Sequence, residues 1–265
     1  MTKINLLIVE GNIKKDTELF VKAAGLSVSQ NLKKLILKLE PTALIKIIHP
    51  GNKTEVDNAS TSLLDFNGVI FTGGAMRIND QSEEIKKHIA FSKKCFNAQK
   101  KILAICWGLQ VCAVAAGGKV SKGTNGAHIG IASNIEINDK GKKHPIYKNK
   151  KNFFNTPAFN FDEVSIIPKD ATILSSDKIN KIMGLHFHVN LSEIWGVQYH
   201  PDYFFKQTIA LTKIRKEKLI NNNYFTSNED FEKNITYIKN EEKKLKLDDR
   251  CCEVKNWLNY IKKKN

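Results

Sequence analysis

A single cysteine, Cys106, lies where an apolar run meets a stretch of small residues. The sequence KILAICWG predicts a buried strand, and residues 107–116 predict a helix that stops at Gly117. A thiol at a helix N-terminus meets the positive end of the helix dipole and unpaired amides, which favour the thiolate. The pattern therefore favours a nucleophile on a sharp strand-to-helix turn, with Gly108 giving the turn room. The alternative is that Cys106 is a small core residue, as cysteines in apolar strands usually are.

A second apolar strand, EIWGVQYHPDYF at 193–204, ends in His200 and is followed by Asp202. A thiolate nucleophile needs a base within hydrogen-bond reach, and the base needs a third group to orient it. Two residues apart on an extended segment, His200 and Asp202 point to the same side, so the carboxylate can hold the imidazole. The alternative is that the His-Pro pair simply ends the strand.

The elements that must position these residues alternate along the first half of the chain. We expect strands at 4–9, 43–49 and 67–74, a helical stretch to about residue 39 that is interrupted near Gly25, and a helix at 81–97 capped by Ser82. This alternation predicts an α/β fold with a mainly parallel sheet. Ligands bind at the carboxyl ends of such strands, where the glycine pair Gly73-Gly74 and Cys106 would meet.

The second half of the chain changes character. Short strands are expected in IASNIEI, NFFNTPAF, ATILSSD, KIMGLHFHV and EIWGVQYH. Beyond Pro201 the pattern becomes helical and polar, in FKQTIALTKIRKEKLI, NEDFEKNITYIKNEEKKL and DRCCEVKNWLNYIKK. A helical C-terminal extension is therefore expected after the sheet.

Composition excludes several classes of function. The formal net charge is +15, but the lysines are scattered and no basic stripe alternates with aromatic residues, so we expect no nucleic-acid partner. The sequence holds no membrane span, and the N-terminal apolar run is too short for a signal peptide, so we expect a cytoplasmic protein. The five cysteines show no metal-ligand spacing, and we expect reduced thiols, no metal and no cofactor. His186 and His188 could pair on a metal, but alternating strand residues are the favoured interpretation.

Three blocks in order, FTGGAM, ICWGLQ and WGVQYHPD, resemble the class I glutamine amidotransferases. More narrowly, the chain resembles stand-alone GMP synthase-like members that lack the synthetase domain. The resemblance implies a Rossmann- or flavodoxin-like domain over 1–205 and a helical extension, 206–265, packed on or beside it. The segment DRCCEVKNWL matches as well, so the resemblance covers nearly the whole chain.

The resemblance implies a role for each residue of the three blocks. Cys106 would attack the amide carbon and carry a γ-glutamyl thioester. His200 would protonate the leaving ammonia and then activate water. Asp202 would orient His200, although the family usually has glutamate there and the shorter acid reaches about one methylene less. The backbone amides of Gly74 and Trp107 would form the oxyanion hole.

Further positions are implied to bind substrate. Gln110 matches the family glutamine that helps to bind the amino acid, and Gly73 and Asn160 would border it. The chain departs from the pattern at Asn160, where relatives often carry histidine, and at His128, where an acidic residue is common. Trp107 is bulkier than the leucine or tyrosine of many members.

Three functions follow from these residues. The leading one is a glutaminase that passes ammonia to a separate synthetase subunit, because the chain has no phosphate-binding loop of the GxxxxGK[ST] type; the helical extension would then be a docking surface. The alternative is a γ-glutamyl peptidase that acts alone on γ-glutamyl conjugates and releases an amine. A non-catalytic regulatory relative is the third, and the intact set Cys106, His200 and Asp202 disfavours it.

Overall fold

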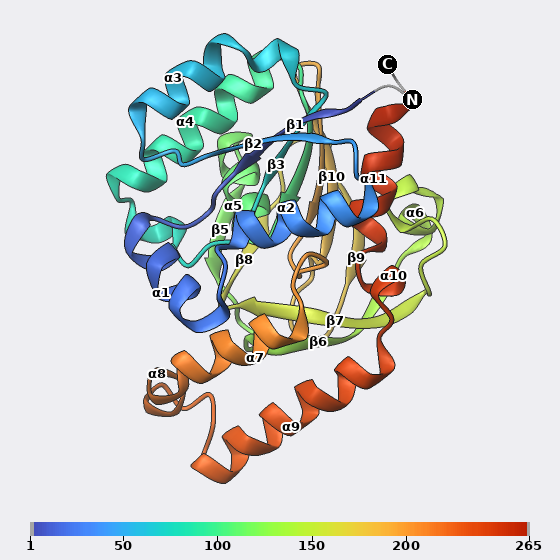
Figure 1. Cartoon of the computed structure of the whole chain (residues 1–265). Coiled ribbons are helices and arrows are strands. Elements are labelled where there is room, and N and C mark those ends of the chain that lie inside the picture. Colours follow the sequence, from blue (N-terminus) through green and yellow to red (C-terminus); the bar gives the residue numbers. More distant parts are fainter. Residues whose placement is uncertain (1–2, 264–265) are drawn as a thin grey trace.

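One nine-stranded sheet forms the centre of the protein, in the order β2-β1-β3-β4-β11-β10-β9-β6-β7 (Figure 1). The computed structural model describes residues 3–263, so the first two and last two residues of the expected domain ranges lie outside the described part. The strands from β2 to β11 run parallel, and the other four continue the sheet antiparallel. The strands are β1 Asn5–Val9, β2 Leu44–Ile48, β3 Gly68–Phe71, β4 Lys101–Ile105, β6 His128–Ile137, β7 Phe153–Asn160, β9 Thr172–Ser176, β10 Gly184–Val189 and β11 Ser192–Val197. The α/β fold is confirmed.

Helices surround this sheet, and a small second sheet pairs β5 Lys119–Lys122 with β8 Asp162–Ile166. The helices are α1 Lys14–Ala24, α2 Val28–Leu39, α3 Lys53–Thr61, α4 Glu83–Asn97, α5 Trp107–Ala115, α6 Asp139–Lys143, α7 Phe205–Ile214, α8 Lys216–Asn221, α9 Asn228–Lys244, α10 Leu247–Arg250 and α11 Cys252–Lys262, with 3-10 turns at Leu63–Asp65, Ile78–Asp80 and Pro145–Tyr147. Between residues 3 and 263, none of these helices combines the length and apolar character needed to cross a bilayer.

The inner parallel strands β1, β3, β4 and β11 are buried on both faces, whereas the edge strand β2 is partly exposed. One face packs against α2 and α11 through apolar side chains such as Leu35 and Trp257. The other face packs against α3, α4 and α5, with Phe91 and Leu109 among the buried residues. Strands covered on both sides read as continuous apolar runs, which is why the sequence located them.

Most expected elements are present at the expected places. Gly25 ends α1 with φ +87°. At the start of α4, the Ser82 hydroxyl accepts a hydrogen bond from the Ile85 N–H. Helix α3 and the small β5-β8 sheet were not expected from the sequence.

The helical extension packs on the rest of the chain at two places. Helices α7 and α9 share a core with β6, β7 and α1, where Phe159 and Phe231 are buried. In α11, the buried Glu253 accepts from Tyr199 Oη at 2.7 Å and pairs with Lys150 Nζ at 2.9 Å. The division at residue 205 stays a prediction.

Candidate active site

Cys106 lies on a sharp turn between β4 and α5. Its backbone has φ +50° and ψ −105°, a conformation that residues with a side chain rarely adopt. The turn is tight because the start of α5 lies against β3: a Cβ on Gly108 would lie 2.4 Å from the carbonyl oxygen of Phe71. A strained turn of this kind holds one side chain at the carboxyl edge of a parallel sheet, as the sequence predicted.

His200 and Asp202 follow the end of β11 and lie beside Cys106. The Nδ1 atom of His200 lies 3.2 Å from Asp202 Oδ1, and the imidazole is close enough to the Cys106 sulfur for the sulfur to raise its pKa. The ring stacks on Tyr203 with 3.7 Å between ring centroids, which fixes its plane. The structure thus brings together the three side chains that the sequence singled out. The shorter acid of this chain reaches the imidazole, although the contact is long.

The charge state of the imidazole follows from its neighbours. Burial alone disfavours the imidazolium, but the Cys106 sulfur and the Asp202 carboxylate outweigh burial and raise the pKa of His200 to about 10. Between residues 3 and 263, Asp202 Oδ2 has no hydrogen-bond partner, so the carboxylate is engaged through one oxygen only. The arrangement favours an imidazolium beside the sulfur.

Two backbone amides beside Cys106 are available to stabilise a developing negative charge. Within the described chain, the N–H groups of Gly74 and Trp107 donate to no protein acceptor, and both residues line the pocket at Cys106. Unsatisfied amides next to a nucleophile are the donors that an oxyanion hole requires. Gly73 lies elsewhere: a Cβ there would lie 2.3 Å from Cε1 of His200, so its backbone packs on the imidazole.

A pocket of about 210 Å³ opens beside Cys106 and contains two of the expected substrate-binding residues, Gln110 and Asn160. Gln110 Nε2 donates to the Asp162 carbonyl at 2.9 Å and to Gln198 Oε1 at 3.2 Å. Gln198 Nε2 in turn lies 3.5 Å from the Cys106 sulfur. Gln198 is a residue that the sequence did not single out, and it joins Gln110 to the thiol.

His128 takes part in the same pocket through Asn160. Its Nδ1 lies 2.9 Å from Asn160 Oδ1, and its Nε2 lies 2.7 Å from Asp177 Oδ2. Asn160 Nδ2 donates to the Asp162 carbonyl, which fixes the amide orientation. Both nitrogens of the imidazole therefore face side-chain oxygens, and the ring is held between Asn160 and Asp177. Burial tends to raise the pKa of Asp177, but His128 and the backbone N–H groups of Ile179 and Asn180 together outweigh burial and lower it.

The three arginines of the chain all lie at this site. Only three of the 42 basic residues are arginine. Arg77 forms a bidentate ion pair with the Asp162 carboxylate (2.6 and 2.8 Å), and Arg215 lines the pocket. The buried Arg250 of α10 donates to the carbonyl oxygens of Pro201 and Tyr203, on either side of Asp202. Arginine is rare in this lysine-rich chain, and its planar guanidinium offers donors that lysine lacks. The three arginine positions could therefore have been recognised in the sequence as candidate site residues.

Trp107 is held by a histidine on α4. Its indole Nε1 donates to His88 Nδ1 at 3.3 Å, and the indole is almost completely buried. Burial lowers the pKa of His88 to about 4, so the ring is neutral and can accept this hydrogen bond. The bulky residue that departs from the expected pattern is thus packed into the core behind the pocket.

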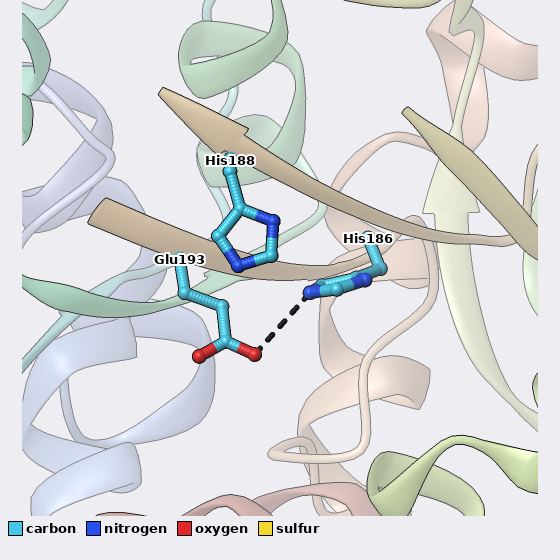
Figure 2. A group of neighbouring side chains, drawn as sticks. All are labelled: His186, His188 and Glu193. Carbon is cyan, nitrogen blue, oxygen red and sulfur yellow. Dashed lines mark hydrogen bonds and ion pairs between the residues drawn. The ribbon is translucent and has the colours of Figure 1, made fainter. Parts of the chain in front are cut away.

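His186, His188 and Glu193 converge at the opposite end of the strands, with ligand atoms within 4.8 Å of one another (Figure 2). His186 Nε2 lies 3.3 Å from Glu193 Oε1. The same carboxylate accepts from Lys101 Nζ and Tyr260 Oη, each at 2.6 Å, and from the Trp195 indole. Glu193 is therefore already neutralised by protein donors, and we interpret the group as an ion-pair cluster that joins α11 to the sheet. The expected absence of a metal stays a prediction.

Comparison with known proteins gives agreeing results. Residues 20–214 match the family model described as glutamine amidotransferase class-I. The chain is similar to a Pseudomonas protein named gamma-glutamyl-L-1-hydroxyisopropylamide hydrolase (27% identity; 76% of this chain, 68% of that one). It is also similar to a glutamine-hydrolyzing GMP synthase subunit of Methanococcus vannielii (27% identity; 52% of this chain, 65% of that one). It therefore spans about two thirds of each. The fold matches the crystal structure of a glutamine amidotransferase from Thermotoga maritima (TM-score 0.71, 16% identity; 98% and 99% of the two chains).

Proposed function

The chain belongs to the class-I glutamine amidotransferase family, and from this premise we propose that it hydrolyses a γ-glutamyl amide with Cys106 as the nucleophile. One observation carries the proposal: Cys106 stands at φ +50° on the strand-to-helix turn, beside a buried imidazole whose pKa its sulfur raises and which a carboxylate orients. A core thiol needs neither the strained backbone nor a polar partner, so the interpretation of Cys106 as packing alone loses its support.

In the proposed first step, the Cys106 thiolate adds to the γ-carbonyl carbon, and the amides of Gly74 and Trp107 receive the oxyanion. The carbon–nitrogen bond then breaks while the His200 imidazolium gives its proton to the leaving nitrogen. The products of this step are a γ-glutamyl thioester on Cys106 and a free amine or ammonia. Asp202 keeps the imidazole oriented throughout.

In the second step, neutral His200 takes a proton from water, and the water oxygen adds to the thioester carbon. The carbon–sulfur bond breaks, glutamate leaves, and the thiolate and the imidazolium are restored. We assign Gln110 and Asn160 to holding the glutamyl part, because both lie in the pocket and their amides are fixed by the Asp162 carbonyl.

The leaving group defines two versions of this function. The similarity to a glutamine-hydrolyzing GMP synthase subunit supports glutamine as substrate and a separate synthetase that receives the ammonia, with the helical extension, residues 206–265, as its docking surface. The similarity to gamma-glutamyl-L-1-hydroxyisopropylamide hydrolase supports a larger amine as the leaving group. Both versions use the same attack by Cys106.

The test is a panel of glutamine and γ-glutamyl dipeptides, scored for released ammonia and released amine. We expect Cys106→Ala to abolish release from every substrate that the wild type cleaves. Cys112→Ala is the matched control, because burial raises the pKa of this second thiol on α5 to about 12 and keeps it protonated. Unchanged turnover in Cys106→Ala would show that the mechanism is wrong. Release of ammonia only after a synthetase is added would favour the version with a separate synthetase.

A further inference from the structure

The guanidinium of Arg215 lines the pocket, stacked on an aromatic ring but without a hydrogen-bond acceptor among residues 3–263. Arg215 is the residue between α7 and α8, and its guanidinium carbon lies 4.7 Å from the ring centre of Phe159. Among residues 3–263 it forms no ion pair, and no protein atom accepts a hydrogen bond from it; Asp16 is close enough to influence its charge but does not pair with it. A half-buried cation without an acceptor is costly, since it loses water and gains no carboxylate.

Arg215 lies on the side of the pocket toward which the leaving amine would depart. The pocket of about 210 Å³ holds Cys106 and the residues assigned to the glutamyl part. A narrow space of about 30 Å³ adjoins it and is lined by His200 and Tyr203. Arg215 and Phe159 line both, so the guanidinium lies where the two spaces meet. Since His200 would deliver its proton to the leaving nitrogen, the leaving amine departs toward this junction.

We propose that Arg215 binds a carboxylate carried by the leaving amine, so that the preferred substrates are γ-glutamyl amino acids or peptides rather than glutamine. This inference rests on the proposed hydrolysis at Cys106. A carboxylate would supply the missing acceptors, and two parallel N–H···O bonds would orient the scissile amide. Ammonia carries no such group, so glutamine would leave the guanidinium unsatisfied.

The choice of arginine at position 215 supports the same conclusion. The other two arginines of the chain both have oxygen acceptors: Arg77 uses two nitrogens on the Asp162 carboxylate, and Arg250 uses Nη1 on two backbone carbonyls. Lysine serves nearly everywhere else in this chain. Arg215 is the one arginine of the described chain whose guanidinium lines the pocket without an oxygen acceptor, so an acceptor can come from a bound ligand.

The experiment measures binding without turnover. In the Cys106→Ala background, calorimetry compares γ-glutamylglycine with γ-glutamylglycinamide, which differ only in the carboxylate. We expect the acid to bind about tenfold to a hundredfold more tightly, the range of a charged hydrogen-bonded pair. Adding Arg215→Gln should make the two ligands bind equally, and adding Arg215→Lys should leave only part of the preference. Lys218→Met is the matched control, because Lys218 is an exposed cation of the same pocket.

Several outcomes would overturn the proposal. Equal binding of the two ligands to Cys106→Ala would do so, and so would a preference that survives Arg215→Gln. A loss of affinity for both ligands by the same factor would assign Arg215 to the glutamyl carboxylate or to folding instead. Absence of turnover in the wild-type protein would contradict the proposed hydrolysis, while the binding comparison would still decide the role of Arg215.

Discussion

Replacement of Arg250 by methionine tests whether the helical extension supports the catalytic segment. Arg250 is buried on α10, and its guanidinium donates to the carbonyls of Pro201 and Tyr203 and lies 4.9 Å from the ring centre of Phe204. These two carbonyls enclose Asp202, the residue that contacts the imidazole. Arg250→Met keeps most of the apolar stem and removes both donors and the charge, whereas Arg250→Lys keeps the charge without the fork.

The magnitude follows from the two hydrogen bonds. A hydrogen bond from a charged group contributes about 1.5–3 kcal/mol, and a buried carbonyl left unpaired costs a similar amount, so we expect Arg250→Met to lower the free energy of unfolding by about 2–4 kcal/mol. Without the Arg250 hydrogen bonds to the Pro201 and Tyr203 carbonyls, the segment that carries Asp202 can move by a fraction of an ångström. Misplacement on that scale lowers kcat by roughly 10–100-fold, while KM changes little because Arg250 does not line the pocket.

Urea denaturation and steady-state release of amine from a γ-glutamyl amide measure the two effects. The rate at which iodoacetamide alkylates Cys106 gives a third readout, because it reports the thiolate and its imidazole partner. Lys243→Met, an exposed change on α9, is the control and should alter none of the three. A folded Arg250→Met protein with kcat within twofold of wild type would refute the reasoning, and Arg250→Lys decides the matter if the methionine variant does not fold.

Three further predictions concern the turn, the carboxylate and pH. Gly108→Ala should lower the free energy of unfolding by about 1–3 kcal/mol, since its Cβ would overlap a backbone carbonyl; an unchanged urea midpoint would contradict this. Asp202→Asn should lower kcat by ~10²–10⁴-fold with the fold intact by circular dichroism, and full activity would remove Asp202 from the mechanism. Because burial lowers the folded-state pKa of His88 to about 4, the unfolded chain binds more protons below pH 6.5, so the His88 contribution to stability should fall by about 3 kcal/mol as pH drops from 6.5 toward 4. Urea titrations at several pH values should show a smaller fall in His88→Asn than in the wild type.

The parts of the fold that the sequence predicted share a local cause. The strands before Cys106 and before His200 are mainly apolar runs of five or six residues. A glycine or a proline follows shortly after each of them, and these residues mark where a strand stops. Ser82 caps a helix by a hydrogen bond to a residue three positions away, so its role is visible in a short window. The approach of Cys106 and His200 also follows from local pattern, because neighbouring parallel strands end at one edge.

The missed features depend on residues far apart in the chain. His128 is 32 positions from Asn160, and Arg250 is 47 positions from Tyr203, so neither hydrogen bond leaves a periodic trace. Arg215 looks like one of many cations on a polar helix until α7 packs against β6 and β7. The strands β5 and β8 are short and half exposed, and their pairing needs the intervening sheet.

The support that Arg250 on α10 gives to the segment around Asp202 has a consequence for the protein during its synthesis. A growing chain contains Cys106, His200 and Asp202 about fifty residues before it contains Arg250. At 5–20 residues per second, this interval is roughly 2–10 s, during which the parallel strands can pair while the segment around Asp202 lacks its support. The nascent domain should therefore hold its reactive thiol without the ability to hydrolyse amides efficiently. On the proposed mechanism, full activity is expected only after α10 has docked, so the order of synthesis delays efficient hydrolysis until the segment around Asp202 is held in place.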